Sequence, residues 1–235
     1  MKEMQDNKTY QCYGLSITPE KGILSKMLIG RLHRQVWEAA EAKLINQYIK
    51  PESTILDLGA CLGITSCLAN KKLLDKKKHV TLEPNIHLIK SLVNIRDENK
   101  CEFQIENSLL SYKPTDELID FYTDPTHVMN GSLTKNDKRT MSQKVKQVTI
   151  GQLEDKYNLN FDTLICDIEG GEWLLWKDKL LINNYFLKFH TIIMEWHGKH
   201  QRPKLYHKIM NDSLKANNYF MKQQTDQVYI FQKKN

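Results

Sequence analysis

The sequence predicts an α/β fold whose sheet is mostly parallel and ends on an antiparallel strand. Short, almost wholly apolar segments, typical of strands buried on both faces of a parallel sheet, alternate with segments of helical periodicity. Two last strands are predicted at 218–223 and 227–233, and because no helix separates them they can pair only antiparallel. This order of elements is that of an α/β architecture.

The other predicted elements follow in order along the chain. A helix is predicted over 31–48, where apolar residues recur at helical spacing, and Pro51 stops it. The remaining strands are predicted at 54–59, 79–83, 101–106, 144–150, 161–169 and 191–196, and the remaining helices at 64–73, 85–96, 151–157 and 203–217. Residues 107–144 are polar and aperiodic, and a stretch of that length is usually a lid or a binding loop.

The composition is that of a globular protein. With 235 residues, 40% hydrophobic and 26% charged, collagen-like, low-complexity and wholly disordered chains are excluded. No membrane span and no secretory signal are predicted, so we expect a cytoplasmic protein. Five cysteines without a C-x-x-C pair argue against a disulfide framework or a structural zinc site. The net charge of +6 keeps a nucleic-acid or other anionic partner open as a minority alternative.

A glycine turn after the strand at 54–59 is the most informative segment. Its spacing, Asp57-x-Gly59-x-x-x-Gly63, matches neither the dinucleotide fingerprint nor the phosphate loop, so a pyrophosphate ligand is disfavoured. Asp57 would repel phosphate and attract a cation. Glu83 ends the next strand, where a carboxylate can accept both hydroxyls of a ribose. One interpretation is a purely structural glycine turn. The other, which these features favour, is a site for a cationic nucleoside cofactor without phosphate, namely S-adenosylmethionine.

A second group of candidates lies in the block that follows the strand at 161–169. Asp167 and Glu169 are two residues apart and would share one face. Glu172 is expected in the first turn of a helix, where a carboxylate meets the helix dipole favourably. Three acids this close could also hold a divalent cation, a hypothesis that we do not favour.

His197 follows Glu195 at the same two-residue spacing, at the end of another predicted strand. Histidine takes up a proton near neutral pH, and a hydroxyl must lose its proton when it attacks a methyl group. His197 is therefore the candidate base, and Glu169 is the competing one. A histidine that is simply hydrogen-bonded within its loop is an equal alternative. Trp173 could wall the acceptor pocket or pack in the core.

Four ordered segments together resemble the FkbM-type S-adenosylmethionine-dependent methyltransferases. They are ILDLGACLG (55–63), LEPN (82–85), CDIEGGEW (166–173) and IMEWHG (193–198). The resemblance covers roughly residues 30–200 and implies a Rossmann-like class I methyltransferase with a seven-stranded, mostly parallel sheet and a final antiparallel strand. It suggests an N-terminal helical extension over 1–50 and a methyltransferase domain over 51–235, with an insert or lid at about 107–147.

The resemblance also implies roles for individual residues. Asp57, Gly59, Ala60 and Gly63 would line the methionine side of the cofactor, Glu83 with Pro84 and Asn85 the ribose, and Glu106, Asn107 and Ser108 the adenine. Asp167 and Glu169 would face the transferred methyl group, with His197 completing the catalytic set. Cys61 stands where the family usually has Asn.

The function implied is O-methylation of a hydroxyl on a sugar or glycan precursor. The alternatives are methylation of a nucleic acid or of a small anionic metabolite, and a non-catalytic module that binds S-adenosylmethionine. The second half of the insert is rich in lysine and arginine, and Lys138 and Arg139 are expected to contact phosphate or carboxylate groups of the acceptor. Glu195 and Trp173 complete the predicted acceptor site, and no metal is assigned.

Overall fold

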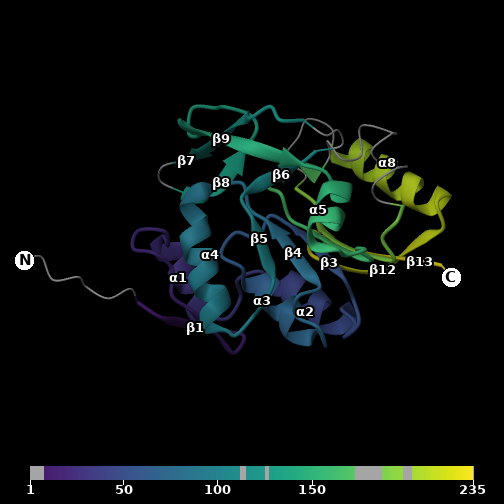
Figure 1. The fold of residues 1–235 in the computed structure, drawn as a ribbon, viewed down its shortest axis with the longest axis horizontal. Helices are drawn as coiled ribbons and strands as arrows, with labels where there is room; N and C mark the ends of the chain where they lie inside the picture. The colour runs from purple at the N-terminus through teal and green to yellow at the C-terminus, as the bar shows by residue number, and fades with distance from the viewer. Residues whose placement is uncertain (1–7, 112–114, 125–126, 173–186, 198–202, 235) are drawn as a thin grey trace, which may run out of the picture.

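The computed structural model describes residues 8–111, 115–124, 127–172, 187–197 and 203–234, and its central feature is a seven-stranded sheet (Figure 1). The strand order is β12-β13-β11-β10-β3-β4-β5. The strands are β3 (Ile55–Leu58), β4 (His79–Leu82), β5 (Gln104–Glu106), β10 (Thr163–Cys166), β11 (Thr191–Glu195), β12 (Tyr219–Thr225) and β13 (Val228–Lys233). Only β13 runs against its neighbours, which confirms the predicted mixed sheet with an antiparallel finish.

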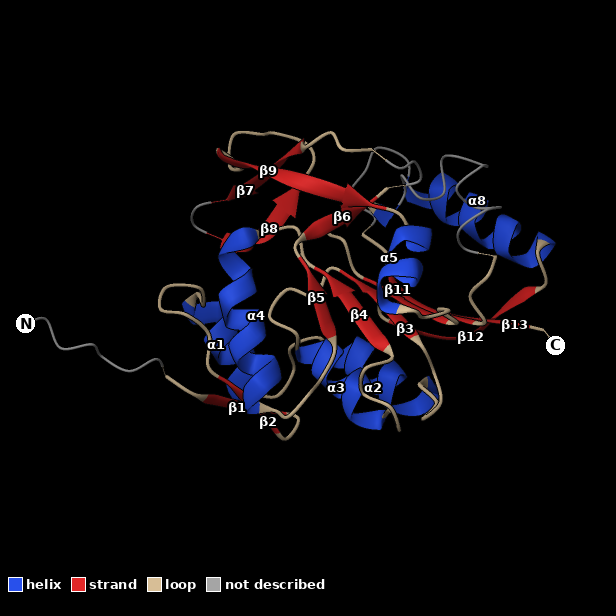
Figure 2. Cartoon of the chain, viewed as in Figure 1, coloured by secondary structure: helices blue, strands red, loops and turns tan. Residues whose placement is uncertain are grey.

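Helices cover both faces of this sheet (Figure 2). One face packs against α2 (Ala39–Tyr48), α3 (Ile64–Lys72) and α4 (Ile86–Glu98), and the other against α5 (Ile150–Tyr157) and α8 (Pro203–Ala216). The inner strands β3, β4 and β10 are wholly buried, with Leu56 and Leu164 facing one helical layer and Ile55 and Ile165 facing the other. This double cover explains why the strands read as continuous apolar runs. None of the described helices combines the length and apolar character that a bilayer crossing requires.

The single helix predicted over 31–48 is wrong, because two helices occupy that stretch. α1 (Lys26–His33) ends before Gln35, and α2 begins after Glu38; both of these residues have positive φ, 54° and 51°. The break buries Trp37 and leaves Val36 exposed, whereas the apolar face of a single helix over 31–48 would include both. Burial of the large indole favours this arrangement over a continuous helix.

The N-terminal segment contains a β-hairpin as well as helices. Strands β1 (Tyr10–Cys12) and β2 (Leu15–Ile17) pair through a turn in which Tyr13 and Gly14 have φ of 51° and 74°. Asn99, at the end of α4, accepts from the Ser16 amide at 3.0 Å and donates to its carbonyl at 2.7 Å. The N-terminal segment expected to be helical therefore contains a β-hairpin in addition to its helices, and the hairpin packs against α3 and α4.

The prediction that residues 107–144 are irregular is also wrong, because most of the described residues in this stretch form a second sheet. Its order is β6-β9-β7-β8, from β6 (Ser108–Leu110), β7 (Ile119–Asp124), β8 (His127–Ser132) and β9 (Met141–Val148). The alternation was missed because few of these side chains are buried, Phe121 and Val145 among them. We call β6 to β9 the insert sheet; it lies over the carboxyl edge of the central sheet (Figure 1).

Candidate functional site

The glycine turn after β3 is shaped by close backbone contacts. Gly59 has φ of 87° and donates its N–H to the carbonyl of Leu82 at 3.0 Å. A Cβ at Gly59 would overlap the carbonyl oxygen of Asp167, so no other residue fits there without a shift. Gly63 caps α3 with φ of 81°, and a Cβ there would overlap the Leu92 side chain. The turn is therefore held against the end of β10, where the acidic block begins.

Glu83 joins this turn to the residues that follow β4. One carboxylate oxygen accepts from the backbone N–H of Cys61 at 2.8 Å, and the other from that of Asn85 at 2.7 Å. The side chain is buried, and burial raises its pKa to about 7 despite these two hydrogen bonds. Each oxygen keeps a lone pair beyond the one already used, so the carboxylate can still accept hydroxyl groups.

The other residues predicted around the nucleoside occupy the same edge. Asn85 caps α4 by accepting from the His87 N–H at 3.1 Å. Asn107 donates to the carbonyls of Glu83 and Pro84, at 2.8 and 2.9 Å. Two further candidates, Ser108 and Glu106, lie nearby. Ser108 is buried at the start of β6, and the Glu106 carboxylate contacts the Lys156 ammonium and the Tyr157 hydroxyl of α5.

Asp57 is turned into the protein rather than toward the sheet edge. Its Oδ2 accepts from the Ser66 hydroxyl of α3 at 2.5 Å and from the Thr81 hydroxyl of β4 at 3.2 Å. His79 lies 3.5 Å from the same oxygen. The side chain thus anchors α3 to the sheet, and a contact between Asp57 and the cofactor stays a prediction.

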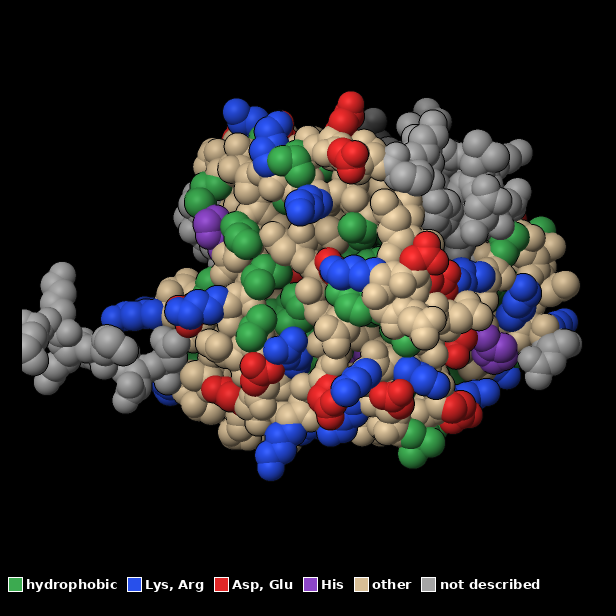
Figure 3. Space-filling view, in the orientation of Figure 1, with side chains coloured by type: hydrophobic (Ala, Val, Ile, Leu, Met, Phe, Trp, Pro, Cys, Tyr) green, Lys and Arg blue, Asp and Glu red, His purple; other side chains and the backbone are tan. Residues whose placement is uncertain are grey.

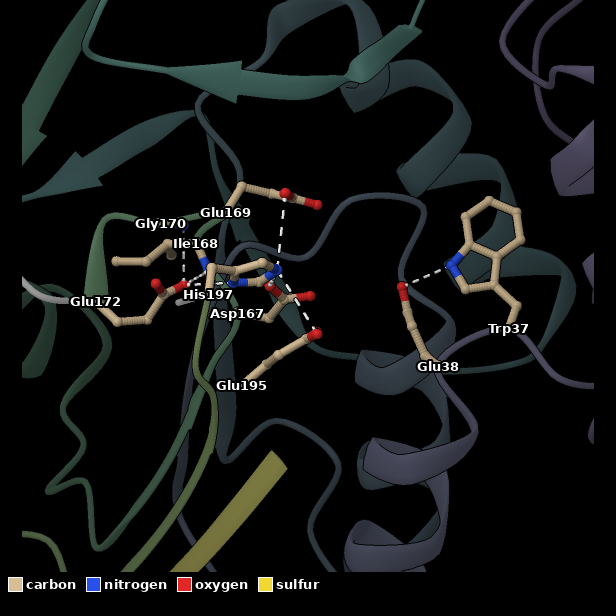
Figure 4. A network of polar contacts seen from close by, with 9 residues as sticks. All are labelled: Trp37, Glu38, Asp167, Ile168, Glu169, Gly170, Glu172, Glu195 and His197. Carbon is tan, nitrogen blue, oxygen red and sulfur yellow. Dashed lines mark hydrogen bonds and ion pairs between the residues drawn. The ribbon is translucent and has the colours of Figure 1, made fainter. Parts of the chain in front are cut away.

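The predicted catalytic residues come together at the carboxyl ends of β10 and β11 (Figure 4). Three carboxylates surround Nε2 of His197, with Glu195 at 3.6 Å, Glu169 at 3.7 Å and Asp167 at 3.8 Å. In parallel α/β sheets this edge is where ligands bind. The structure therefore groups four residues that the sequence placed in two separate segments.

Glu172 holds His197 from the opposite side. Its Oε1 accepts from the backbone amides of Ile168 and Gly170, at 3.0 and 3.3 Å, and lies 3.1 Å from Nδ1 of His197 (Figure 4). A carboxylate only accepts, so Nδ1 carries the proton of this hydrogen bond. Glu172 is buried, and it fixes both the acidic loop and the imidazole, a role beyond the expected helix-dipole contact.

The charges around His197 set its proton affinity. Burial alone would lower the pKa of the imidazole, but the hydrogen bond with Glu172 and the charges of Glu172, Glu195 and Glu169 outweigh it. The net effect raises the pKa of His197 above its ordinary value. The pKa of Asp167 is held well above its usual range by burial and by the neighbouring charges of Glu195 and Glu169.

Two acids extend this cluster, Glu38 at the N-cap of α2 and Glu41 in its first turn, and the sequence interpretation missed both. Burial and a hydrogen bond with Glu195 raise the pKa of Glu41 to about 9. Burial raises the pKa of Glu38 to about 7, while the Trp37 indole N–H donates to its Oε1 at 2.9 Å. Glu41 stands four residues after Trp37 and four before Ile45, on the apolar stripe of the helix. A carboxylate on a core face was the signal that could have identified it.

Within the described residues, two groups have the spacing of metal ligands. Asp167, Glu169 and His197 form one, and Glu41, Asp167 and Glu195 form the other, with the ligand atoms of each within 4.8 Å of one another. Carboxylate oxygens suit Mg²⁺ or Ca²⁺. The same groups also suit a cationic ligand or proton exchange, so the donor set alone does not select a metal.

Two of the predicted acceptor residues lie in the insert. Lys138 and Arg139 follow Asn136, whose side-chain oxygen accepts from both of their backbone amides, at 3.0 and 2.8 Å. The Lys138 side chain is exposed. Trp173 lies outside the described residues.

The order of the central sheet, with a glycine turn at the carboxyl end of β3, is that of a Rossmann-like α/β fold with a candidate ligand site at this edge. A family model described as the methyltransferase FkbM domain matches residues 57–221. The chain belongs to the FkbM methyltransferase family, which confirms the resemblance of the four ordered segments. A comparison with curated proteins finds no match.

Several solved structures are similar to this chain at low sequence identity. A Streptococcus mutans protein described as a SAM-dependent methyltransferase matches 98% of this chain with a TM-score of 0.53 and 11% identity. Only 56% of that protein is covered, so this chain spans little more than half its length. A ribosomal protein L11 methylase from Lactobacillus delbrueckii subsp. bulgaricus has a TM-score of 0.49 and 12% identity, over 93% of this chain and 86% of its own. An rRNA methylase from Streptococcus thermophilus has a TM-score of 0.46 and 8% identity, over 83% and 94%.

Proposed function

We propose that this protein transfers the methyl group of S-adenosylmethionine to a hydroxyl group, and that the acceptor is a sugar or glycan precursor. The observation that carries the proposal is the pair formed by Glu172 and His197, at 3.1 Å, beside the glycine turn. Glu172 keeps the proton on Nδ1, so in the neutral imidazole the Nε2 lone pair points toward the three carboxylates. A histidine oriented in this way by a carboxylate is suited to act as a general base.

The cofactor side of the site fits the proposed methyl donor. S-adenosylmethionine supplies an electrophilic methyl group on a cationic sulfonium. A sulfonium near Asp167 and Glu169 would favour the ionised form of both carboxyl groups and be attracted by it, and Glu83 can accept the ribose hydroxyls. The positive φ values of Gly59 and Gly63 shape the turn that lies beside these residues.

In the proposed reaction, His197 Nε2 accepts the hydroxyl proton while the acceptor oxygen attacks the methyl group in line with the leaving sulfur. Glu195 and Glu169, which lie near Nε2, stabilise the imidazolium that forms. The same two carboxylates can accept hydrogen bonds from neighbouring hydroxyls of a sugar. Holding both reactants in line supplies much of the rate.

Other acceptors are outcomes that the test must distinguish. Basic and acidic side chains are intermixed on the face shown in Figure 3, which does not favour a nucleic acid bound there. A small anionic metabolite could be held by Lys138 and Arg139, whereas a module that only binds the cofactor would show no turnover. The cytoplasmic location and the division of the chain near residue 50 stay predictions.

The proposal is tested by incubating the protein with acceptor extracts and isotopically labelled S-adenosylmethionine, followed by mass spectrometry of the products. We expect label on the hydroxyl oxygen of a carbohydrate, and loss of that product with the His197→Ala variant. Label on nitrogen, or product that disappears on treatment with ribonuclease, would contradict O-methylation of a glycan precursor. Binding of the cofactor without turnover on any fraction would favour the non-catalytic module.

A further inference from the structure

The loop that follows β4 is held by two side chains from outside the central sheet. Asn107, just before β6, donates to the carbonyls of Glu83 and Pro84. Gln143, in β9, donates its Nε2 to the carbonyl of Pro84 and accepts at Oε1 from the N–H of Ile86, at 3.1 Å. The insert sheet is therefore hydrogen-bonded to this loop at two places, through Asn107 just before its first strand and through Gln143 in β9.

The Gln143 amide acts on this loop as a neighbouring strand would. It exchanges one donated and one accepted hydrogen bond with the backbone at Pro84 and Ile86, two residues apart. Ile86 begins α4, and the first amides of a helix have no partner within it. Gln143 supplies that partner for Ile86, whereas Asn85 supplies the one for His87.

The same loop follows Glu83, the residue predicted to bind the ribose hydroxyls. Glu83 precedes Pro84, and its carboxylate receives the N–H of Asn85, between the two positions that Gln143 holds. Any shift of residues 84–86 therefore moves the carboxylate that joins β4 to the glycine turn through Cys61. A displacement of about 1 Å at a binding residue is enough to weaken a preorganised site.

We propose that Gln143 is a positioning residue that couples the insert sheet to the cofactor side of the site, so that binding of S-adenosylmethionine and ordering of β9 favour each other. Gln143 itself contacts the loop backbone and acts on the cofactor through Glu83. Coupling between two sites is reciprocal, so a ligand at one must stabilise the other. This inference rests on the proposed use of S-adenosylmethionine.

The first test is calorimetry of S-adenosylmethionine with the whole chain and with Gln143→Ala. Loss of the two hydrogen bonds is expected to raise the Kd by about 3- to 10-fold. Gln143→Glu keeps only the acceptor for Ile86 and should lie between the two proteins. The matched control is Gln147→Ala, because Gln147 is in the same strand but donates to the carbonyl of Glu117, at 3.2 Å, inside the insert. Its Kd should equal that of the unmodified protein.

The second test is amide hydrogen exchange over Met141–Val148 with and without S-adenosylmethionine. The cofactor should slow exchange there in the unmodified protein and in Gln147→Ala, but not in Gln143→Ala, although exchange in β4 still slows. Equal Kd values and equal protection in both variants would overturn the coupling. If Gln143→Ala fails to fold, Gln143→Glu is judged by the same criteria. Failure of the unmodified protein to bind the cofactor would instead overturn the proposed function.

Discussion

The carboxylate of Glu172 and the imidazole of His197 form a hydrogen bond of 3.1 Å between the loops that follow two neighbouring parallel strands. Glu172 also accepts from two backbone amides of the acidic loop. It therefore fixes the ring that the sequence identified as a base and the loop that carries Asp167 and Glu169. One buried carboxylate links the two motifs that we assign to catalysis.

If His197 is the base, His197→Ala should lower turnover by about 100-fold or more. Cofactor affinity should change little, because the residues assigned to the ribose and adenine are not contacts of His197. Glu169→Gln should be the milder change, since Glu169 is more exposed than His197, at 46% against 12% of the side chain. Steady-state kinetics and calorimetry check both variants. The reverse order of effects would make Glu169 the base and His197 structural.

The rate should rise with pH along an acid limb set by His197. The base must be neutral to accept a proton, and its pKa is raised above the ordinary value, so activity is lost as pH falls below that raised pKa. Glu172→Gln removes a charge that raises this pKa. The acid limb of kcat should therefore move to lower pH, with a lower plateau because the imidazole is less well oriented. An acid limb that does not move in Glu172→Gln would contradict the assignment of His197 as the base. In a separate test, activity that is lost in a chelator and restored by magnesium would show that the carboxylates are metal ligands.

Glu38→Gln should stabilise the protein at pH 8 by an amount on the order of 1 kcal/mol. The pKa of Glu38 is raised from 4.5 to about 7, so the folded state holds a proton that the unfolded chain releases between these values. The contribution of this group to stability therefore falls as pH rises through that window. The amide still accepts from Trp37. Thermal unfolding should show a gain at pH 8 and little change at pH 4.5; a loss at pH 8 would contradict the argument.

Reversing two charges of the insert, Lys138→Glu with Arg139→Glu, should raise the KM for the acceptor by about 10-fold or more if they contact its anionic groups. Cofactor binding should be unaffected. The control is Lys77→Glu with Lys78→Glu, an equal change of charge on exposed residues just before β4, at the opposite edge of the sheet. If the two double variants raise the acceptor KM equally, the effect is one of net charge, and the proposed contacts of Lys138 and Arg139 with the acceptor are wrong.

The central sheet could be predicted because its inner strands are buried on both faces and separated by clear turn residues. Residues 54–59 and 191–196 needed only their apolar character, and the positions of Asp167, Glu169 and His197 followed from where those strands end. The insert sheet could not be predicted in the same way. Its strands are half-exposed, so their alternation is weak, and pairing partners such as Phe121 and Gln143 are far apart in the sequence.

The contacts that orient the site were also beyond the sequence. Glu172 and His197 are 25 residues apart, and Gln143 reaches Pro84 over 59 residues, so no local pattern links them. In the sequence Glu41 resembles any acid on a helix, although its spacing of four residues from both Trp37 and Ile45 places it on a buried face. Such pairs follow from tertiary packing, which overrides local periodicity.

The most direct test of the account is calorimetry of the protein with S-adenosylmethionine, its demethylated product and NAD. Both sulfur compounds should bind, and NAD should not. Glu83→Gln should weaken binding by about 10-fold or more, because a charged acceptor of the ribose hydroxyls is lost. The affinity of the unmodified protein should fall as pH drops below 7, since the pKa of Glu83 is about 7 and the carboxylate is the stronger acceptor. Binding of NAD without binding of the methyl donor would contradict the account.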